Sequence, residues 1–495
     1  MFKRALCCCL LLFGDLHGVG SFKNGEKQKH IEEKFWNIDP YNLESLCAYY
    51  HLYRDQLSLQ RLLQLFPSLQ ESEVLLFVRS ILEKENKVLL EEEQSVIDKL
   101  SCEGLVLSLS DSSSSIDPEK DLGRALVFAE FSDAAEEKAR YYGRVLDILA
   151  LRIHVERLRA LDREHYALGS KEYHKVTIEA MNRILFYEEG IRYPSKKEMF
   201  SDEFSFLSSV ADRKFGVCLG VSSLYFALSQ RVGVPLEAVT PPGHIYLRYL
   251  EGEVNIETTA GGRHLSTESY DNSLDPKKLR IRTPKEILGL TFMNQGSCAL
   301  QKQKYAEAEA SYEKALKYLE DEELKELLGF VRILQGKKKE GKHLLKHSPQ
   351  AEVQGSMNYD YLHGNIDDKT LSLLFQDPGL TYQEITQYGE ELKKAMKNSP
   401  KCCEGYRRLA SIAFHLGKIA EGVALLERCV QDSPQDLVLH LKLCKILCER
   451  YDYAKALHYF LRARELAESQ GVSQETLHSS MLYVEVLKKL NTVAP

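Results

Sequence analysis

The chain has 495 residues, of which 44% are hydrophobic and 28% are charged, and its formal net charge at pH 7 is −7. This composition is typical of a folded protein of roughly two to four domains, and it excludes bulk disorder. The negative charge disfavours general binding to nucleic acid or to anionic membranes, because both need clustered lysine and arginine.

The N-terminal segment differs from the rest of the chain. Lys3 and Arg4 precede an apolar run that ends at Phe13, and small residues follow before Ser21. This pattern predicts a signal peptide over residues 1–20 and an exported or periplasmic protein. The alternative is a buried apolar segment in a cytoplasmic protein. The run is too short to span a membrane.

Helical periodicity then dominates, and it predicts a helical domain over residues 21–110. Pro67 divides two of its helices, and a serine-rich tract ending at Ser115 marks a linker over residues 111–120. Charged helical sequence runs from Leu122 to Leu161, and we expect its charges to form a solvated face. A further helix is expected from Tyr173 to Glu188.

Cys218 opens the stretch in which chemistry is most strongly indicated. Gly216 and Val217 precede it, apolar residues follow at helical spacing, and Gly233 ends the segment as a C-terminal cap does. We therefore expect Cys218 in the first turn of a helix, where the helix dipole favours a thiolate. Three β-rich runs follow at residues 236–240, 244–250 and 254–258, and Pro241-Pro242-Gly243 breaks the chain just before His244.

A cysteine at a helix start, followed by a histidine and a carboxylate on successive strands, is the order of a Cys-His-acid catalytic site. Each residue taken alone is also compatible with a purely structural role. Asn255 and Glu257 share one face of the last strand, so the turn must decide between them. If Glu251-Gly252 forms a two-residue hairpin turn, Arg248 lies opposite Asn255, and Glu257 lies diagonally next to His244. This register favours Glu257 as the residue that orients His244.

The C-terminal part of the chain repeats. Ile419, Gly422, Leu426 and Cys429 recur 34 positions later as Tyr453, Ala456, Phe460 and Ala463. A small residue where two helices cross, with a larger one four positions later, is the tetratricopeptide signature. It predicts an all-α repeat domain over residues 291–495, interrupted between Gln350 and Gly379, where glycine and proline accumulate.

Other motifs indicate neither a cofactor nor a metal. The segment Gly336 to Lys342 resembles a phosphate-binding loop, but it has His343 where serine or threonine should follow, so we expect a solvated turn between helices. The cysteines show no zinc-type spacing. Those beyond the signal segment, other than Cys218, are expected to be small core residues: Cys47, Cys102, Cys298, Cys402, Cys403, Cys429, Cys444 and Cys448.

Three segments together carry a resemblance: Arg213 to Gly220, Gly243-His244, and Met181 to Phe186 upstream. The chain resembles the transglutaminase-like superfamily, and most closely its bacterial SirB-type branch, which is often joined to tetratricopeptide repeats. The resemblance implies a papain-like core over residues 121–290, with Cys218 as nucleophile, His244 as base and Glu257 orienting the imidazole. The family usually has Asp in the position of Glu257. Trp36, the only tryptophan, lies far from the site in sequence.

The expected fold class is therefore α+β: a transglutaminase-like core between an N-terminal helical domain and a C-terminal tetratricopeptide-type solenoid. Two functions stay open. In one, Cys218 attacks an amide carbonyl and passes the acyl group to water or to an amine. In the other, the domain is a non-catalytic scaffold, and the repeats bind a protein or peptide partner in their concave groove. The sequence indicates no oligomeric state.

Overall fold

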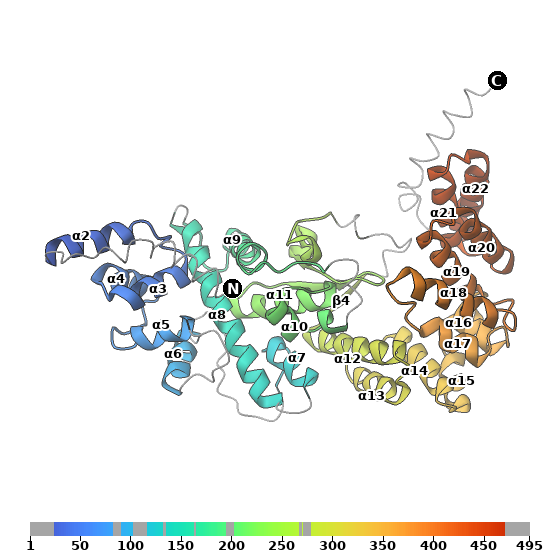
Figure 1. Ribbon diagram of the computed structural model, residues 1–495, viewed down its shortest axis with the longest axis horizontal. Coiled ribbons are helices and arrows are strands. Elements are labelled where there is room, and N and C mark those ends of the chain that lie inside the picture. Colours follow the sequence, from blue (N-terminus) through green and yellow to red (C-terminus); the bar gives the residue numbers. More distant parts are fainter. Residues whose placement is uncertain are drawn as a thin grey trace, which may run out of the picture. The chain divides into compact units, whose positions relative to one another are not determined.

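The computed structural model describes residues 24–82, 91–101, 116–131, 135–162, 165–194, 202–266, 270 and 279–470 (Figure 1). The chain divides into two compact units, of which the first comprises residues 1–194, 203–238 and 246–264. The second comprises residues 195–202, 239–245 and 265–495. The domain boundaries expected from the sequence stay predictions. The expected signal peptide, the first half of the expected linker and Cys102 lie outside the described residues.

The first unit begins with short helices, as the periodicity predicts. They are α2 (Asn24–Phe35), α3 (Leu43–Tyr53), α4 (Gln56–Leu65), α5 (Val74–Leu82) and α6 (Glu91–Ser101). Asn42 and Asp55 fix the starts of α3 and α4, because their side chains accept hydrogen bonds from backbone amides of the first turn. Apolar side chains of these helices form one core, which also takes Ile148, Leu151 and Val155.

Longer helices follow in the same unit. They are α7 (Leu122–Glu130), α8 (Ala135–Leu161), α9 (Lys171–Asn182), the π-helix η2 (Arg183–Glu188), α10 (Leu207–Arg213) and α11 (Cys218–Val232), with the 3₁₀ turn η3 (Asp202–Ser205) before α10. The helix expected from Tyr173 to Glu188 is thus α9 with its π-helical continuation. Helix α11 is buried along most of its length and packs against α7 and α8. Gly233 ends it with φ of 73°, the left-handed cap that glycine permits.

Four short strands form one sheet in the order β3-β2-β1-β4. They are β1 (Glu237–Thr240), β2 (Tyr246–Tyr249), β3 (Val254–Ile256) and β4 (Arg280–Arg282). Strands β2 and β3 are antiparallel, and Arg248 lies opposite Asn255. Glu251 and Gly252 both have positive φ, 54° and 106°, and the Glu253 amide donates to the Leu250 carbonyl at 3.0 Å. This is the two-residue hairpin turn expected from the sequence, with the expected register.

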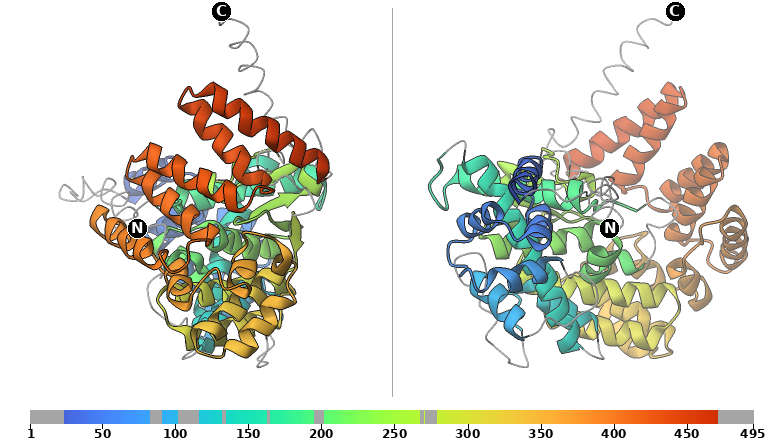
Figure 2. Two further views of the ribbon diagram at one scale, coloured as in Figure 1. Left: turned by 90° about the vertical axis from the view of Figure 1, so that its right-hand side faces the viewer. Right: turned by 60° about the vertical axis from the view of Figure 1, so that its left-hand side comes forward.

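The second unit contains the helical repeats. Its helices are α12 (Pro284–Gln301), α13 (Tyr305–Ala315), α14 (Glu322–Leu334), α15 (Lys338–Lys346), α16 (Met357–Leu362), α17 (Asp368–Phe375), α18 (Tyr382–Ala395), α19 (Cys403–His415), α20 (Ile419–Asp432), α21 (Leu437–Glu449) and α22 (Tyr453–Ser469). The helices pack most extensively in the successive pairs α12–α13, α14–α15, α19–α20 and α21–α22, and the red pair α21–α22 can be followed in Figure 2. The expected interruption is occupied by the short helices α16 and α17.

Small residues allow the paired helices to approach closely. A Cβ on Gly422 would lie 2.4 Å from the ring of Phe414, and one on Gly296 would lie 2.5 Å from the ring of Tyr312. Ala456 is fully buried where α22 packs on α21. The 34-residue period is therefore a packing period, and the tetratricopeptide-type prediction is confirmed. Gly336, with φ of 89°, lies in the turn between α14 and α15, so the phosphate-loop resemblance is a helix connection.

Candidate active site

Cys218 is the first residue of α11. The chain before it is fixed by a backbone hydrogen bond from the Val217 amide to the Phe204 carbonyl, 2.9 Å long. Two glycines make this packing possible: a Cβ on Gly216 would lie 2.5 Å from Val210, and a Cβ on Gly220 would lie 2.4 Å from the Phe204 carbonyl oxygen. The first N–H groups of a helix have no partner within it, so the Cys218 amide is a natural hydrogen-bond donor for a bound oxyanion.

Cys218 differs in exposure from most other cysteines. It is half-buried, as is Cys298, whereas the remaining described cysteines are buried: Cys47, Cys402, Cys403, Cys429, Cys444 and Cys448. Burial raises the pKa of the Cys429 thiol to about 12, and it does the same for Cys402 and Cys444. These thiols are therefore protonated at neutral pH and behave as small apolar core groups, as the sequence predicts for them.

His244 follows a tight turn. Its backbone amide donates to the Pro241 carbonyl at 3.1 Å, and Gly243 has φ of 73°. Proline at the second position and glycine with positive φ at the third define a type II turn. Pro242 and Gly243 therefore set the position of His244 in the segment that connects β1 to β2. The half-buried imidazole stacks on the ring of Tyr270, with centroids 6.1 Å apart and planes inclined by 16°.

Glu257 directly follows β3 and is buried, with 4% of its surface exposed. It caps the 3₁₀ turn η5 (Thr258–Ala260), because its Oε1 accepts a hydrogen bond from the Thr259 amide at 3.0 Å. Its carbonyl accepts from the Gly262 amide at 2.9 Å, which closes the loop after the strand. The carboxylate therefore sits in a defined local structure at the end of the hairpin.

Helix α11 is tied to this loop one turn after Cys218. The hydroxyls of Ser222 and Thr258 are hydrogen-bonded at 2.9 Å. Ser222 is four positions after Cys218 and therefore lies on the same helix face, about 6 Å further along the axis. The loop that begins after Glu257 is thus tied to the face of α11 that carries Cys218. These two residues belong to the first unit, and His244 belongs to the second.

Tyr193 is a further candidate for the site, and sequence reasoning missed it. Arg192 pairs with Phe215 in a parallel bridge, and its carbonyl accepts from the Gly216 amide at 3.2 Å. Tyr193 is thereby brought beside the segment that leads into Cys218. Burial raises the pKa of the Tyr193 hydroxyl, and the charge of Cys218 raises it further, so the two side chains lie within electrostatic reach. No local sequence pattern predicts that Tyr193 lies near Cys218, because this proximity depends on pairing with residues more than twenty positions away.

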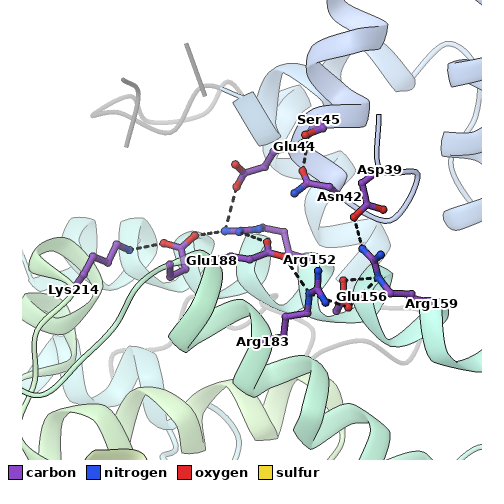
Figure 3. Close-up of polar contacts among 11 residues, drawn as sticks. Asp39, Asn42, Glu44, Ser45, Arg152, Glu156, Arg159, Arg183, Glu188 and Lys214 are labelled. Atoms are coloured by element: carbon purple, nitrogen blue, oxygen red, sulfur yellow. Dashed lines mark hydrogen bonds and ion pairs between the residues drawn. The ribbon is translucent and has the colours of Figure 1, made fainter. Parts of the chain in front are cut away.

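An ion network surrounds the buried Arg152 (Figure 3). Arg152 on α8 forms ion pairs with Glu44 and Glu188, each at 3.1 Å, and with Glu189. Lys214, four residues before Cys218, pairs with Glu189 at 2.7 Å. Burial alone would raise the pKa of Glu189, but Arg152 and Lys214 together lower it to about 2. The network therefore stays charged at neutral pH and anchors the segment before Cys218 to α8.

The solvated face expected for the charged helix from Leu122 to Leu161 is wrong for α8. Asp147, Arg152 and Glu156 are all buried. Each is paired with a charge from another part of the fold, as Asp147 is with Arg231 at 2.8 Å. Buried charges persist where such partners compensate their desolvation, and those partners come from elsewhere in the sequence.

Within the described ranges, no group of three or more His, Cys, Asp or Glu side chains is arranged to hold a metal ion. The same part of the chain contains no helix with the length and apolarity needed to cross a membrane.

The fold comprises a transglutaminase-like domain joined to tetratricopeptide-type helix pairs. The chain carries a domain of the transglutaminase-like superfamily over residues 145–289, where the model of that family matches. The recognition made from the three sequence segments and the α+β fold class are thereby confirmed.

Bacterial relatives named "UPF0162 protein" match part of the chain. The Vibrio cholerae protein is 24% identical over 181 residues, which cover 34% of this chain and 67% of the relative. A Xylella fastidiosa protein is 28% identical over 99 residues, and the match spans only 35% of that relative. Among solved structures, MamA matches at 20% identity and a TM-score of 0.19, covering 37% of this chain and 99% of MamA. Yeast Tom70 matches at 13% identity and a TM-score of 0.22, and the match covers 99% of this chain and 97% of Tom70.

Proposed function

We propose that the transglutaminase-like domain is a cysteine-dependent acyl transferase or amide hydrolase. Cys218 is the nucleophile, His244 its general base and acid, and Glu257 the group that orients the imidazole. The observation that carries this proposal is the position of Cys218 at the start of α11, half-buried, on the helix face that Ser222 ties to the Glu257 loop. A thiol at a helix N-terminus beside a base is the arrangement that activates cysteine for attack.

The reaction proceeds in two steps. His244 takes the proton of Cys218, the sulfur attacks the amide carbonyl carbon, and collapse of the tetrahedral intermediate breaks the C–N bond. The amine leaves with the proton held by His244. Water or a second amine then attacks the thioester and gives a proton to His244, and the C–S bond breaks. Cys218 recovers its proton, and the acyl group ends as an acid or a new amide.

The tetrahedral intermediate requires two hydrogen-bond donors for its oxyanion. The backbone amide of Cys218 supplies one. We assign the second to the Tyr193 hydroxyl, because the bridge between Arg192 and Phe215 places Tyr193 beside the segment that leads into Cys218. A tyrosine rather than a tryptophan fills this role in our proposal. The single tryptophan, Trp36, lies on the segment after α2 and is 75% exposed.

The repeat unit contributes binding rather than chemistry in this proposal. Tetratricopeptide-type helix pairs stack into an array whose concave surface suits an extended or helical peptide. We infer that this surface binds a protein or peptide partner and so selects the acyl donor or acceptor for the thiol site.

Formation of an acyl-enzyme tests the proposal directly. The full chain is incubated with p-nitrophenyl acetate at neutral pH and analysed by peptide mass spectrometry. We expect an acetyl group on Cys218, none in Cys218→Ser, and unchanged acetylation in Cys298→Ser, since Cys298 is the other half-buried cysteine. Acetylation spread equally over Cys218 and Cys298 would contradict the thiol-enzyme proposal and favour the non-catalytic scaffold.

Export is a further part of the proposal. It rests on the basic and apolar pattern between Lys3 and Phe13. N-terminal sequencing of the protein from its native cell should give a product that begins near Ser21, and a product that retains residues 1–20 would refute export by a cleaved signal.

A further inference from the structure

Asn182, at the end of α9, joins two parts of the first unit that are far apart in sequence. Its Nδ2 donates to the Gly262 carbonyl at 3.2 Å. Its Oδ1 accepts from the Tyr225 hydroxyl at 2.9 Å. Tyr225 lies on α11 and is fully buried. One carboxamide therefore bridges the helix that begins at Cys218 and the loop that follows Glu257.

The loop is shaped to fit this carboxamide. Gly262 has φ of 76°, and a Cβ there would lie 2.1 Å from Asn182 Oδ1, so only glycine fits. A Cβ on the preceding Gly261 would lie 4.0 Å from the Phe186 ring, which itself stacks on Tyr225 with centroids 6.3 Å apart. Asn182 and Phe186 are four positions apart and thus form one surface, against which Gly261 and Gly262 pack. The Gly262 amide in turn donates to the Glu257 carbonyl at 2.9 Å.

The contacts on α11 follow its helical repeat. Cys218, Ser222 and Tyr225 are spaced i, i+4 and i+7, which places them along one face. Ser222 is hydrogen-bonded to Thr258, and Tyr225 is linked to Gly262 by the two hydrogen bonds of Asn182. The loop is consequently fixed to the Cys218 face at two points, one at Thr258, the first residue of η5, and one at Gly262, which follows η5. Glu257 lies immediately before this doubly held segment.

The segment that follows Asn182 is tied to α8. The π-helix η2 begins at the next residue, and π-helical segments occur frequently at functional sites. Its first residue, Arg183, pairs with Glu156 on α8 at 3.2 Å, and its last residue, Glu188, pairs with Arg152 (Figure 3). Asn182 thus projects from a segment that is anchored on the far side by the ion network.

We propose that Asn182 is a positioning residue of the thiol site, whose carboxamide holds the Glu257 loop against the helix that begins at Cys218. It touches neither the substrate nor the reacting atoms, and acts through Glu257 on the orientation of His244. This inference rests on the proposed function. It adds a residue on which the reactivity of Cys218 depends, although Asn182 precedes the nucleophile by 36 positions.

The test uses Asn182→Asp in the full chain. The substitution keeps the shape and the acceptor for Tyr225, but replaces the donor to Gly262 with a carboxylate oxygen that repels its carbonyl. Iodoacetamide labelling of Cys218 is followed by mass spectrometry across pH 5 to 9. We expect the rate at neutral pH to fall by roughly tenfold or more, because small misplacements of reacting groups carry such costs. The pH profile of the labelling rate should change as well.

Three further variants separate positioning from simple damage to the fold. Thr177→Val removes another buried side-chain hydrogen bond on α9, away from the Glu257 loop, and should leave Cys218 labelling unchanged. Gly262→Ala should reproduce the effect of Asn182→Asp from the opposite side of the contact. In a Glu257→Gln background, Asn182→Asp should slow labelling no further, because both substitutions act on one pathway.

The outcomes are distinct. Fast, selective labelling of wild-type Cys218 that is unchanged in Asn182→Asp and Gly262→Ala would overturn the positioning role and leave the proposed function standing. Additive effects of Asn182→Asp and Glu257→Gln would also overturn it. Labelling of wild-type Cys218 no faster than that of Cys429 would refute the proposed function, and the positioning role with it.

Discussion

Replacing Arg231 should destabilise the first unit more than any surface change. Its guanidinium is fully buried near the end of α11. Nε donates to Asp147 at 2.8 Å, and the two terminal nitrogens donate to Asp121 at 3.0 Å and to the Ala227 carbonyl at 3.2 Å. Arg231→Met keeps most of the apolar volume but leaves two buried carboxylates without their cation. Removal of one partner from a buried ion pair costs about 3–5 kcal/mol, which we expect at neutral pH.

The stability lost in Arg231→Met should be larger at neutral pH than in mild acid. Burial raises the pKa of Asp147 to about 6 even though Arg231 lowers it, and its Oδ2 has no hydrogen-bond partner among the described residues. The carboxyl group of Asp147 therefore binds its proton more tightly in the folded state than in the unfolded state. The free energy of unfolding consequently falls as pH rises from about 4 toward 6. Without Arg231 the pKa of Asp147 rises further, and the fall continues above pH 6. The loss caused by Arg231→Met should thus be smaller at pH 5 than at pH 7.5.

Hydrogen exchange with increasing urea, followed in peptides of α8 and α11, measures this stability without interference from the second unit. Arg248→Met is the matched control, because its partner Glu237 is substantially exposed and the pair should contribute about 0–1 kcal/mol. A loss for Arg231→Met no larger than that of the control, or a loss equal at both pH values, would refute the reasoning.

Three shorter predictions follow from the same structure. Ala456→Glu forces a charge into the packed α21–α22 crossing and should destabilise the repeat unit by roughly several kcal/mol in a melting experiment, whereas unchanged melting would mean that the helices do not pack tightly there. Glu257→Gln should slow iodoacetamide labelling of Cys218 sharply while Asn255→Ala changes it little, and the reverse ranking would show that Glu257 does not orient His244. Tyr193→Phe should reduce acetylation of Cys218 by p-nitrophenyl acetate by about tenfold or more while leaving its iodoacetamide rate nearly unchanged, since only the acyl reaction forms an oxyanion. Equal loss in both reactions would exclude Tyr193 as the oxyanion donor.

Local features of the site could be read from the sequence because their causes are local. Gly233 ends α11 as predicted, since a left-handed cap needs only glycine at that position. The β2–β3 register followed from Glu251-Gly252, because a two-residue turn fixes the pairing of its strands. The repeat period was visible because helix crossings demand small residues at fixed intervals.

Features that depend on distant partners could not be read in this way. Asn182 lies 80 positions from Gly262, and Arg231 lies 84 positions from Asp147. The charges of α8 looked solvated because their number and spacing fit an exposed helix, and only the tertiary fold supplies the partners that allow Arg152 to be buried. A single sequence contains no signal for such pairs until the elements are placed in space.

The reactivity of Cys218 tests the central claim most directly. The full chain is treated with a limiting amount of iodoacetamide at pH 7, and the labelling rate of each cysteine is measured by peptide mass spectrometry, in wild type and in His244→Ala. The thiol site predicts that Cys218 reacts far faster than Cys298 and Cys429, and that His244→Ala removes most of this advantage. Equal rates for Cys218 and Cys429, or undiminished labelling of Cys218 in His244→Ala, would contradict the assignment of a catalytic thiol.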